Sequence, residues 1–341
     1  MRCVPRFVMA GLLAAALAAP SRAAEVDNLL PMETEFVVQV NVKQMLEADI
    51  IKKYALAQMK QALEGKDAQK ALKDLGLDPM KDIDKLTIGL WGKTQDDGNG
   101  VLIARGTFDA AKIMESARTA AKDMADKVSI VKEGELELIK FTGDKGKPGY
   151  ISVREGQPLI AGTDKKIVAA CVAAGNDKAK PALSKELTAL VLKQDAKASV
   201  FMCGVTEGKV GEIPGDFGQL KALGVDGDKI KAGLGKMNSM GMTVNLGKDV
   251  NVAIKLGMKD NDSADDFGTE VTKLVTAAKA FLPIVGGNQP QFKSLIDDVS
   301  KTLDSVSKEK DVVVTVKISA EAIGKAAGSG EDKEKDKDND K

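Results

Sequence analysis

The hydrophobic pattern changes its period early in the chain. Between residues 36 and 41 apolar side chains stand at every second position, which predicts a β-strand. From Leu46 to Leu63 apolar residues recur at helical spacing, and Asn41 with Gln44 matches the capping box that opens a helix. We therefore expect a strand that leads directly into a capped helix, with residues 47–49 as the place where the helix is open to interruption.

The pattern predicts further elements up to residue 174. A short helix ends at Gly76, and an alternating strand follows in residues 85–93. The stretch 94–100 is rich in turn residues, and residues 101–108 read as the returning strand of a hairpin. Asp109 caps a predicted helix that runs to about Met124. Three strand-like segments within residues 136–163 and a helix containing Cys171 complete this half.

The second half repeats the order of the first. Residues 198–205 resemble the opening strand, and the sequence LGVD at 223–226 echoes LGLD at 75–78. A strand, turn and strand at 241–258 match the first hairpin, and the helical pattern that follows matches the helix after Asp109. With a last strand at 311–319, each half reads strand, helix, strand, strand, helix, strand. Repetition of these landmarks in the same order, at offsets of about 150–160 residues, indicates an internal duplication.

This order predicts the α+β fold class. We expect two ferredoxin-like repeats, residues 24–180 and 181–327, with antiparallel sheets and helices packed on one face. The two repeats lie either side by side or in one extended sheet, and their joint falls in residues 175–197. Residues 328–341 contain no apolar side chain, so a disordered charged tail is expected there.

The first 23 residues have the layout of a secretory signal peptide. Two arginines precede an apolar run at 7–19, and small residues around Ala23 fit a cleavage site. The run is short for a membrane span, although an uncleaved anchor stays an alternative. We expect cleavage after Ala23, export to the periplasm or beyond the cell, and no stable membrane span in the mature chain.

Composition and charge describe an ordinary globular protein. The chain has 341 residues, 43% of them hydrophobic, and a formal net charge of zero. Loss of residues 1–23 removes Arg2, Arg6 and Arg22 and no acid, so the charge becomes about −3. A mildly acidic chain argues against nucleic acid and against anionic membranes as partners.

Two cysteines remain after signal cleavage. Cys171 lies in an alanine-rich helical run and Cys203 in an apolar strand, so both fit the pattern of buried thiols. The exported location also permits a disulfide between Cys171 and Cys203. Sequence spacing does not decide between the two states.

The chain contains no histidine, which excludes the Ser-His-Asp and Cys-His mechanisms and imidazole zinc sites. The sequence SVSK at 305–308 fits the Ser-x-x-Lys pattern of some hydrolases but lacks its companion motifs, so it reads as a polar helix end before a strand. No phosphate-binding glycine motif is present. We expect no catalytic residue and no cofactor.

An acidic cluster and a group of methionines are the remaining candidates. Asp260, Asp262, Asp265 and Asp266 suggest calcium, but Asp265 stands where an EF-hand loop needs glycine, so helix capping is the stronger interpretation and no metal is expected. The methionines, including Met242, either fill core gaps or line an adaptable binding surface.

Residues 29–115 carry a resemblance to a family. The sequence LLPMETEFVVQVNVKQMLEADIIKKY, joined to LGLDPMKDIDKLTIG and GVLIARGTFDAAKI, resembles paralogue-rich exported bacterial proteins of unknown function. That resemblance implies export and fold and supplies no catalytic residue.

The function expected from all these features is that of a non-enzymatic periplasmic or envelope protein that binds a protein partner or has a structural role. A small-ligand carrier that uses the cleft between the repeats is the alternative. A histidine-independent hydrolase is the third possibility.

Overall fold

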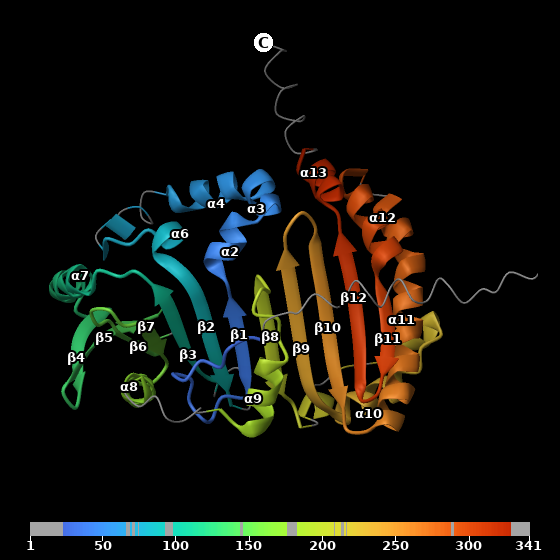
Figure 1. Ribbon diagram of the computed structural model, residues 1–341, viewed down its shortest axis with the longest axis horizontal. Coiled ribbons are helices and arrows are strands. Elements are labelled where there is room, and N and C mark those ends of the chain that lie inside the picture. Colours follow the sequence, from blue (N-terminus) through green and yellow to red (C-terminus); the bar gives the residue numbers. More distant parts are fainter. Residues whose placement is uncertain are drawn as a thin grey trace, which may run out of the picture.

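The computed structural model of the chain describes residues 23–65, 75–92, 98–143, 146–175, 183–207, 217–287 and 290–328, together with residues 69, 72–73, 209–212 and 215. Most of the predicted tail and most of the predicted signal peptide lie outside these ranges. Within them the strands form one twelve-stranded sheet in the order β11-β12-β10-β9-β8-β1-β2-β3-β7-β6-β5-β4 (Figure 1). Every neighbouring pair is antiparallel. The fold is therefore of the mixed α and β class, with a large antiparallel sheet.

The strands are β1 (Phe36–Val40), β2 (Ile83–Trp91), β3 (Asn99–Gly106), β4 (Val128–Glu133), β5 (Leu136–Thr142), β6 (Pro148–Ser152), β7 (Leu159–Gly162), β8 (Val200–Val205), β9 (Met237–Leu246), β10 (Val250–Met258), β11 (Asp304–Lys308) and β12 (Asp311–Ile318). The helices are α2 (Val42–Glu47), α3 (Asp49–Tyr54), α4 (Leu56–Leu63), α6 (Pro79–Asp82), α7 (Ala110–Asp123), α8 (Lys165–Ala174), α9 (Lys185–Leu192), α10 (Gly227–Gly235), α11 (Asn261–Gly287), α12 (Lys293–Thr302) and α13 (Ala320–Gly328). Short 3₁₀ turns include η2 (Lys209–Glu212), η3 (Gly218–Leu223) and η4 (Pro290–Phe292).

Two halves of the chain meet at the centre of the sheet. The first strands of the halves, β1 and β8, pair antiparallel with Val38 opposite Met202. Outward from this seam the order is β1-β2-β3-β7 on one side and β8-β9-β10-β12 on the other. The halves therefore share one extended sheet and the same order of their first three strands.

Aspartate caps recur at corresponding places in the two halves. Asp78 before β2 and Asp226 before β9 each accept a backbone N–H two residues later, at 3.1 Å in both cases. After β3 and β10, Asp109 caps α7 at 2.9 Å and Asp260 accepts the Ser263 N–H at the start of α11 at 2.8 Å. Each carboxylate satisfies a backbone donor that the first helical turn leaves free. The predicted landmarks thus coincide with caps in both halves.

The prediction of ferredoxin-like topology is wrong. In a β-α-β-β-α-β unit the strands joined through a helix run parallel, with another strand between them. Here β1 and β2, which α2 to α6 connect, are direct neighbours and antiparallel. The first half also contains β4, and the second contains β11, which the periodicity did not reveal. Local hydrophobic patterns identify strands but do not encode which strands become neighbours.

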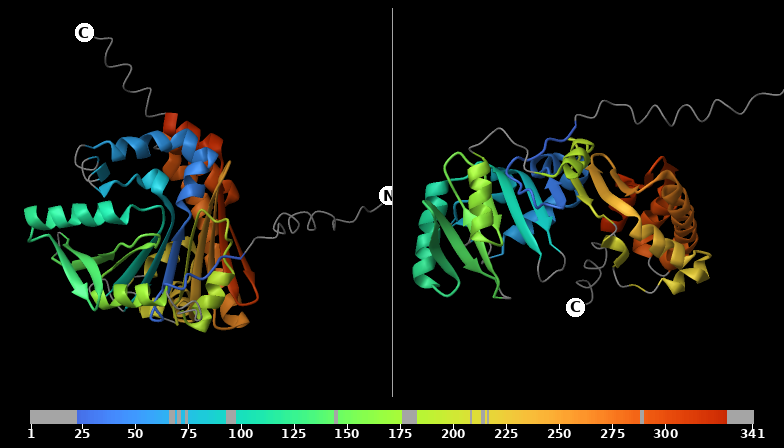
Figure 2. Two further views of the ribbon diagram at one scale, coloured as in Figure 1. Left: turned by 60° about the vertical axis from the view of Figure 1, so that its left-hand side comes forward. Right: turned by 90° about the horizontal axis from the view of Figure 1, so that it is seen from below.

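Helices cover both faces of the first half, in contrast to the predicted single face. Adjacent residues of β5 point to opposite faces because the side-chain period of a strand is two. Leu138 joins a core with Val168 and Cys171 of α8, whereas Ile139 joins a core with Ile113 of α7. We call these the α8 face and the α11 face, since cross-strand register places α7 and α11 on the same side. In the right-hand view of Figure 2 the green helix α7 lies at one end of the sheet and the orange helix α11 at the other, with the blue helices α2 to α4 between them.

Candidate functional site

An apolar row crosses the α11 face from β6 to β12. The register aligns Leu102 with Ile88, Ile88 with Val38, Val38 with Met202, and Met202 with Met242. Beyond these central strands the row continues to Ile151 on one side and Val314 on the other, which lie in the cores under α7 and α11. The central part of the row therefore lies between two helix-covered parts.

The central side chains of this face lie outside all three cores. We define the central apolar surface as the half-buried or exposed apolar residues of β1, β2, β3, β8 and β9 on the α11 face: Phe36, Val38, Val40, Leu86, Ile88, Leu90, Leu102, Val200, Met202, Met242 and Val244. None of them belongs to a buried cluster of the described residues. The most exposed, Leu90, has 43% of its surface accessible.

This composition departs from that of an ordinary solvated sheet face. Antiparallel sheets that face water on one side usually alternate apolar inward and polar outward positions. In β1 the positions on the α11 face are Phe36, Val38 and Val40, although the opposite face already carries the buried Val37. A contiguous apolar area at the surface is characteristic of a site that binds another molecule.

Packing in the seam holds this surface in place. The ring of Phe36 lies across Gly204 of β8, where a Cβ atom would come within 2.1 Å of the ring. Glycine at position 204 thus lets the aromatic ring lie flat on the neighbouring strand. At the same end of β1, Lys209 pairs with Glu35 at 2.7 Å.

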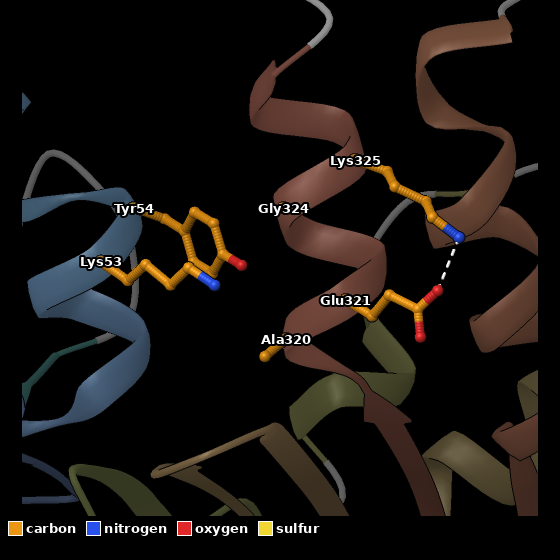
Figure 3. A pocket seen from close by; sticks show the side chains of 6 residues that line it. All are labelled: Lys53, Tyr54, Ala320, Glu321, Gly324 and Lys325. Atoms are coloured by element: carbon orange, nitrogen blue, oxygen red, sulfur yellow. Dashed lines mark hydrogen bonds and ion pairs between the residues drawn. The ribbon is translucent and has the colours of Figure 1, made fainter.

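Apart from this surface, a hollow lies between α3 and α13, at the ends of the central strands (Figure 3). It has a volume of about 570 Å³ and is lined by Lys53, Tyr54, Ala320, Glu321, Gly324 and Lys325. The Tyr54 ring points toward α13, and a Cβ atom at Gly324 would lie 2.5 Å from its hydroxyl oxygen. The Lys53 Nζ atom lies 5.0 Å from the centroid of the same ring. The hollow therefore lies between one helix from each half of the chain.

Two of the charged side chains that line this hollow form an ion pair with each other. Lys325 Nζ donates to Glu321 Oε1 at 2.6 Å along α13, on the side away from Tyr54 (Figure 3). This hydrogen bond raises the pKa of Lys325 and lowers the pKa of Glu321. Neither shift produces a general acid or base near neutral pH, because each stabilises the ordinary charged form. The hollow can attract a polar ligand through Lys53 and Tyr54 but contains no proton-transfer pair.

The acidic cluster and the Ser-x-x-Lys stretch each have a role in the fold: the first lies at the start of a helix, and the second is part of a strand. Asp260 starts α11, as the capping interpretation predicted, and Asp262, Asp265 and Asp266 are exposed on the first turns of that helix. Within the described ranges, no group of three or more Asp, Glu, His or Cys side chains is placed to hold a metal ion. The SVSK stretch is not a helix end. It forms β11, because it pairs with β12 across a two-residue turn in which Glu309 has a positive φ of 55°.

The two thiols lie in the same core and are free. Cys171 and Cys203 are 2% and 0% exposed and belong to the cluster beneath α8 and α9. Burial raises the pKa of each thiol to about 12. The disulfide that the sequence left open is not formed in this structure.

Of the methionines, Met237 fills a core, whereas Met202 and Met242 belong to the central apolar surface.

The sequence carries a signal for this surface. The strands around the seam are apolar at consecutive positions, as in Phe36, Val37 and Val38, rather than strictly alternating. A run of this kind indicates a strand that is apolar on both faces. Which of the two faces a helix covers depends on the tertiary structure.

Comparison with known proteins adds little. No protein-family model and no curated protein matches the sequence. One solved structure, described as crystal form I of TP0453, is similar over 90% of this chain and 98% of its own, with a TM-score of 0.44 and 10% identity. Among the helices of the described residues, none combines the length and the apolarity needed to cross a membrane.

Proposed function

We propose that the chain is an exported, non-enzymatic protein of the periplasm or cell envelope and that it binds another protein through the central apolar surface. The observation that carries the proposal is the position of this surface, which spans the seam between the halves and belongs to no core. Sheet faces of this kind bury their apolar side chains against a second layer. A protein partner supplies such a layer.

The shape and chemistry of the surface support a protein partner over a small molecule. Its side chains come from five neighbouring strands and are aliphatic, with Phe36 and the two methionines as the exceptions. Small-ligand sites are concave and place a few polar groups among apolar ones. Interfaces between proteins are broad, and their central parts are depleted of charge.

Export is proposed from residues 1–23 and from the resemblance of residues 29–115 to exported bacterial proteins. The backbone nitrogen of Ala24 donates to the carbonyl oxygen of Gln194 at 3.0 Å, and the Ala24 side chain is buried. Cleavage after Ala23 converts this nitrogen to an ammonium group, which retains the same donor. We also propose that the two halves arose by duplication, which the shared strand order and aspartate caps support.

A site-specific crosslinking experiment tests the proposal. A photo-crosslinking amino acid at Ile88, within the central apolar surface, is compared with one at Leu192, an exposed apolar residue of α9. In cells that export the protein, we expect one defined protein adduct at position 88 and none at 192. Met202→Lys in the same chain abolishes that adduct, because a charge is introduced beside Val38. Absence of a position-88 adduct, or equal adducts at both positions, overturns the proposal.

Cell fractionation tests export separately. We expect a mature protein in the periplasm or envelope fraction whose first residue is Ala24. An intact chain in the cytoplasm contradicts the proposed localisation, whatever the crosslinking result.

A small-ligand role is the second candidate, favoured by the hollow between α3 and α13. Its volume falls in the range of about 300–1,000 Å³ that is typical of ligand sites. A small molecule that co-purifies in native mass spectrometry, and that Tyr54→Ala removes, would support this role.

A further inference from the structure

The strand β11 forms one edge of the sheet. Among the described strands it pairs with β12 alone, through a two-residue turn at Glu309 and Lys310 that sets Lys308 opposite Asp311. The residues that flank such a turn exchange both backbone hydrogen bonds, and bonded positions then alternate along the strand. Asp304, Val306 and Lys308 therefore bond to β12. The N–H and C=O groups of Ser305 and Ser307 point away from the sheet.

A groove runs beside this edge, under α11. It has a volume of about 480 Å³ and is lined by Asp265, Gly268, Thr269, Thr272, Lys273 and Ser307. The α11 residues of the groove repeat at intervals of three and four, so they form one stripe along the helix. The hydroxyl groups of Thr272 and Ser305 lie 3.0 Å apart. The helix packs closely on the strand at this place, because a Cβ atom at Gly268 would lie 1.7 Å from Ser307 Oγ.

The order of residues in β11 is complementary to itself. When two copies of β11 run antiparallel about Val306, Ser305 of each copy stands opposite Ser307 of the other. These are the positions whose backbone groups point outward, so both pairs can form. Val306 then stands opposite Val306, and Asp304 stands opposite Lys308 at both ends. Val306 is 57% exposed in the single chain, so this contact covers an apolar side chain that water otherwise surrounds.

Other antiparallel registers of two β11 strands lose these facing pairs. Pairing Ser305 with Ser305 sets Asp304 opposite Val306, and pairing Ser307 with Ser307 sets Lys308 opposite Val306. Each shift removes both charge pairs and the Val306 contact. Opposite charges and β-branched residues in facing positions stabilise a pair of strands. The register centred on Val306 is therefore the preferred one.

The two charged residues of the stripe follow the same symmetry, and Lys273 also pairs with the buried Glu270 of its own chain at 2.8 Å. Asp265 and Lys273 stand four residues on either side of Thr269. A two-fold axis through the β11 pair runs the two α11 helices antiparallel, which brings Asp265 of one copy toward Lys273 of the other. A two-fold interface uses the same patch on both copies and requires such self-complementarity.

We propose that a second copy of this chain binds at β11, so that two sheets join edge to edge into one continuous sheet. This proposal is independent of the proposed function, because β11 lies at an edge of the sheet and the central apolar surface lies at its middle. The two-fold complementarity of charge favours a second copy over a foreign strand.

Variants that exchange the charges of Asp304 and Lys308 test the proposal. The mature chain, residues 24–341, is studied by sedimentation equilibrium across micromolar concentrations, and a monomer–dimer equilibrium is expected. In the dimer Asp304→Lys sets lysine opposite Lys308, and Lys308→Asp sets aspartate opposite Asp304. We expect each single change to weaken the dimer about tenfold or more. The double variant restores the opposite charges, so its dimerisation returns to near the wild-type level.

A backbone variant provides an independent readout. Ser305→Pro removes an N–H that points outward and leaves the bonds to β12, so it should abolish dimerisation in a folded chain. Ser305→Ala retains that N–H and serves as its matched control. Circular dichroism verifies folding of every variant.

Hydrogen exchange locates the interface directly, since the amides of Ser305 and Ser307 should become protected in the dimer. A wild-type chain that stays monomeric overturns the proposal. A dimer that is insensitive to the β11 variants, or that the double exchange does not restore, also overturns it.

Discussion

The Asn41 side chain donates a hydrogen bond of 2.6 Å from Nδ2 to the backbone carbonyl oxygen of Ala198. The same group reaches the carbonyl oxygen of Ala196 at 3.3 Å, and Gln44 Nε2 donates to that of Lys197. The two residues that fit a capping box therefore do not cap α2. They tie the end of β1 to the segment that enters β8, across the seam between the halves.

Replacing Asn41 should loosen this seam. In Asn41→Leu the carbonyl groups of Ala196 and Ala198 lose their partner in a partly buried setting, so we expect a loss of about 1–3 kcal/mol in the free energy of unfolding. Urea denaturation checks this, with a lower midpoint and an unchanged slope. Asn251→Leu on the exposed face of β10 is the matched control, and its effect should stay within about 0.5 kcal/mol. Equal losses in the two variants would show that Asn41 has no special role.

Local features of the fold could be predicted from the sequence. The hairpin of β2 and β3 and the cap of α7 by Asp109 follow from short-range patterns, and they are confirmed. The interruption of the first helix at Ala48 is also confirmed, since α2 ends at Glu47 and α3 begins at Asp49. These features depend on neighbours within a few residues.

Long-range features could not be predicted in this way. The pairing of β1 with β8 joins residues more than 150 positions apart, and no local period contains that information. The capping-box interpretation failed for the same reason, because Asn41 and Gln44 found distant carbonyl groups instead. The apolar run in β1 was visible in the sequence. Which of its two faces is covered depends on helix packing, because Val37 shares a core with α8 and α9 whereas Val38 belongs to none of the three cores.

An ion pair between a buried carboxylate and a half-exposed arginine holds the N-terminal segment against β3. Arg105 donates to Asp27 at 2.8 Å, and the Asp27 side chain is only 2% exposed. Arg105→Met leaves that carboxylate buried without its partner, so a loss of about 3–5 kcal/mol is expected. Thermal or urea unfolding measures it.

The pair of Arg118 and Glu137 provides the matched control. Its N–O distance is 2.6 Å, but its side chains are 52% and 41% exposed, so Arg118→Met should cost less than about 1 kcal/mol. Comparable losses from the two arginine variants would contradict a distinction based on burial.

Asp298 joins α12 to the start of α13. Its Oδ2 atom accepts the Ser319 hydroxyl at 2.5 Å and the Ser319 N–H at 2.8 Å. These bonds lower the pKa of Asp298 below its ordinary value. The resulting stabilisation is present above the unfolded pKa of about 3.9 and is lost as the pH falls through the folded pKa.

Asp298→Asn should therefore lower stability at neutral pH by about 1 kcal/mol, and the difference from wild type should shrink at acid pH. Urea midpoints at a series of pH values measure it. Asp297→Asn, which affects an exposed pair with Lys293, is the control. A difference between wild type and Asp298→Asn that is constant with pH would show that the charge of Asp298 is not involved.

The buried cysteines should be slow to react. A thiol reacts as its thiolate, and burial raises the pKa of Cys171 and Cys203 to about 12, so little thiolate exists at pH 8. We expect a disulfide-exchange reagent to modify the folded mature chain at a rate limited by unfolding and to titrate both thiols in denaturant. A rate that follows the unfolding rate in Arg105→Met would establish that protection comes from the core. If protein purified from cells instead shows no free thiol in denaturant, the two cysteines are bridged in the cell, and the free thiols of this structure are not the cellular state.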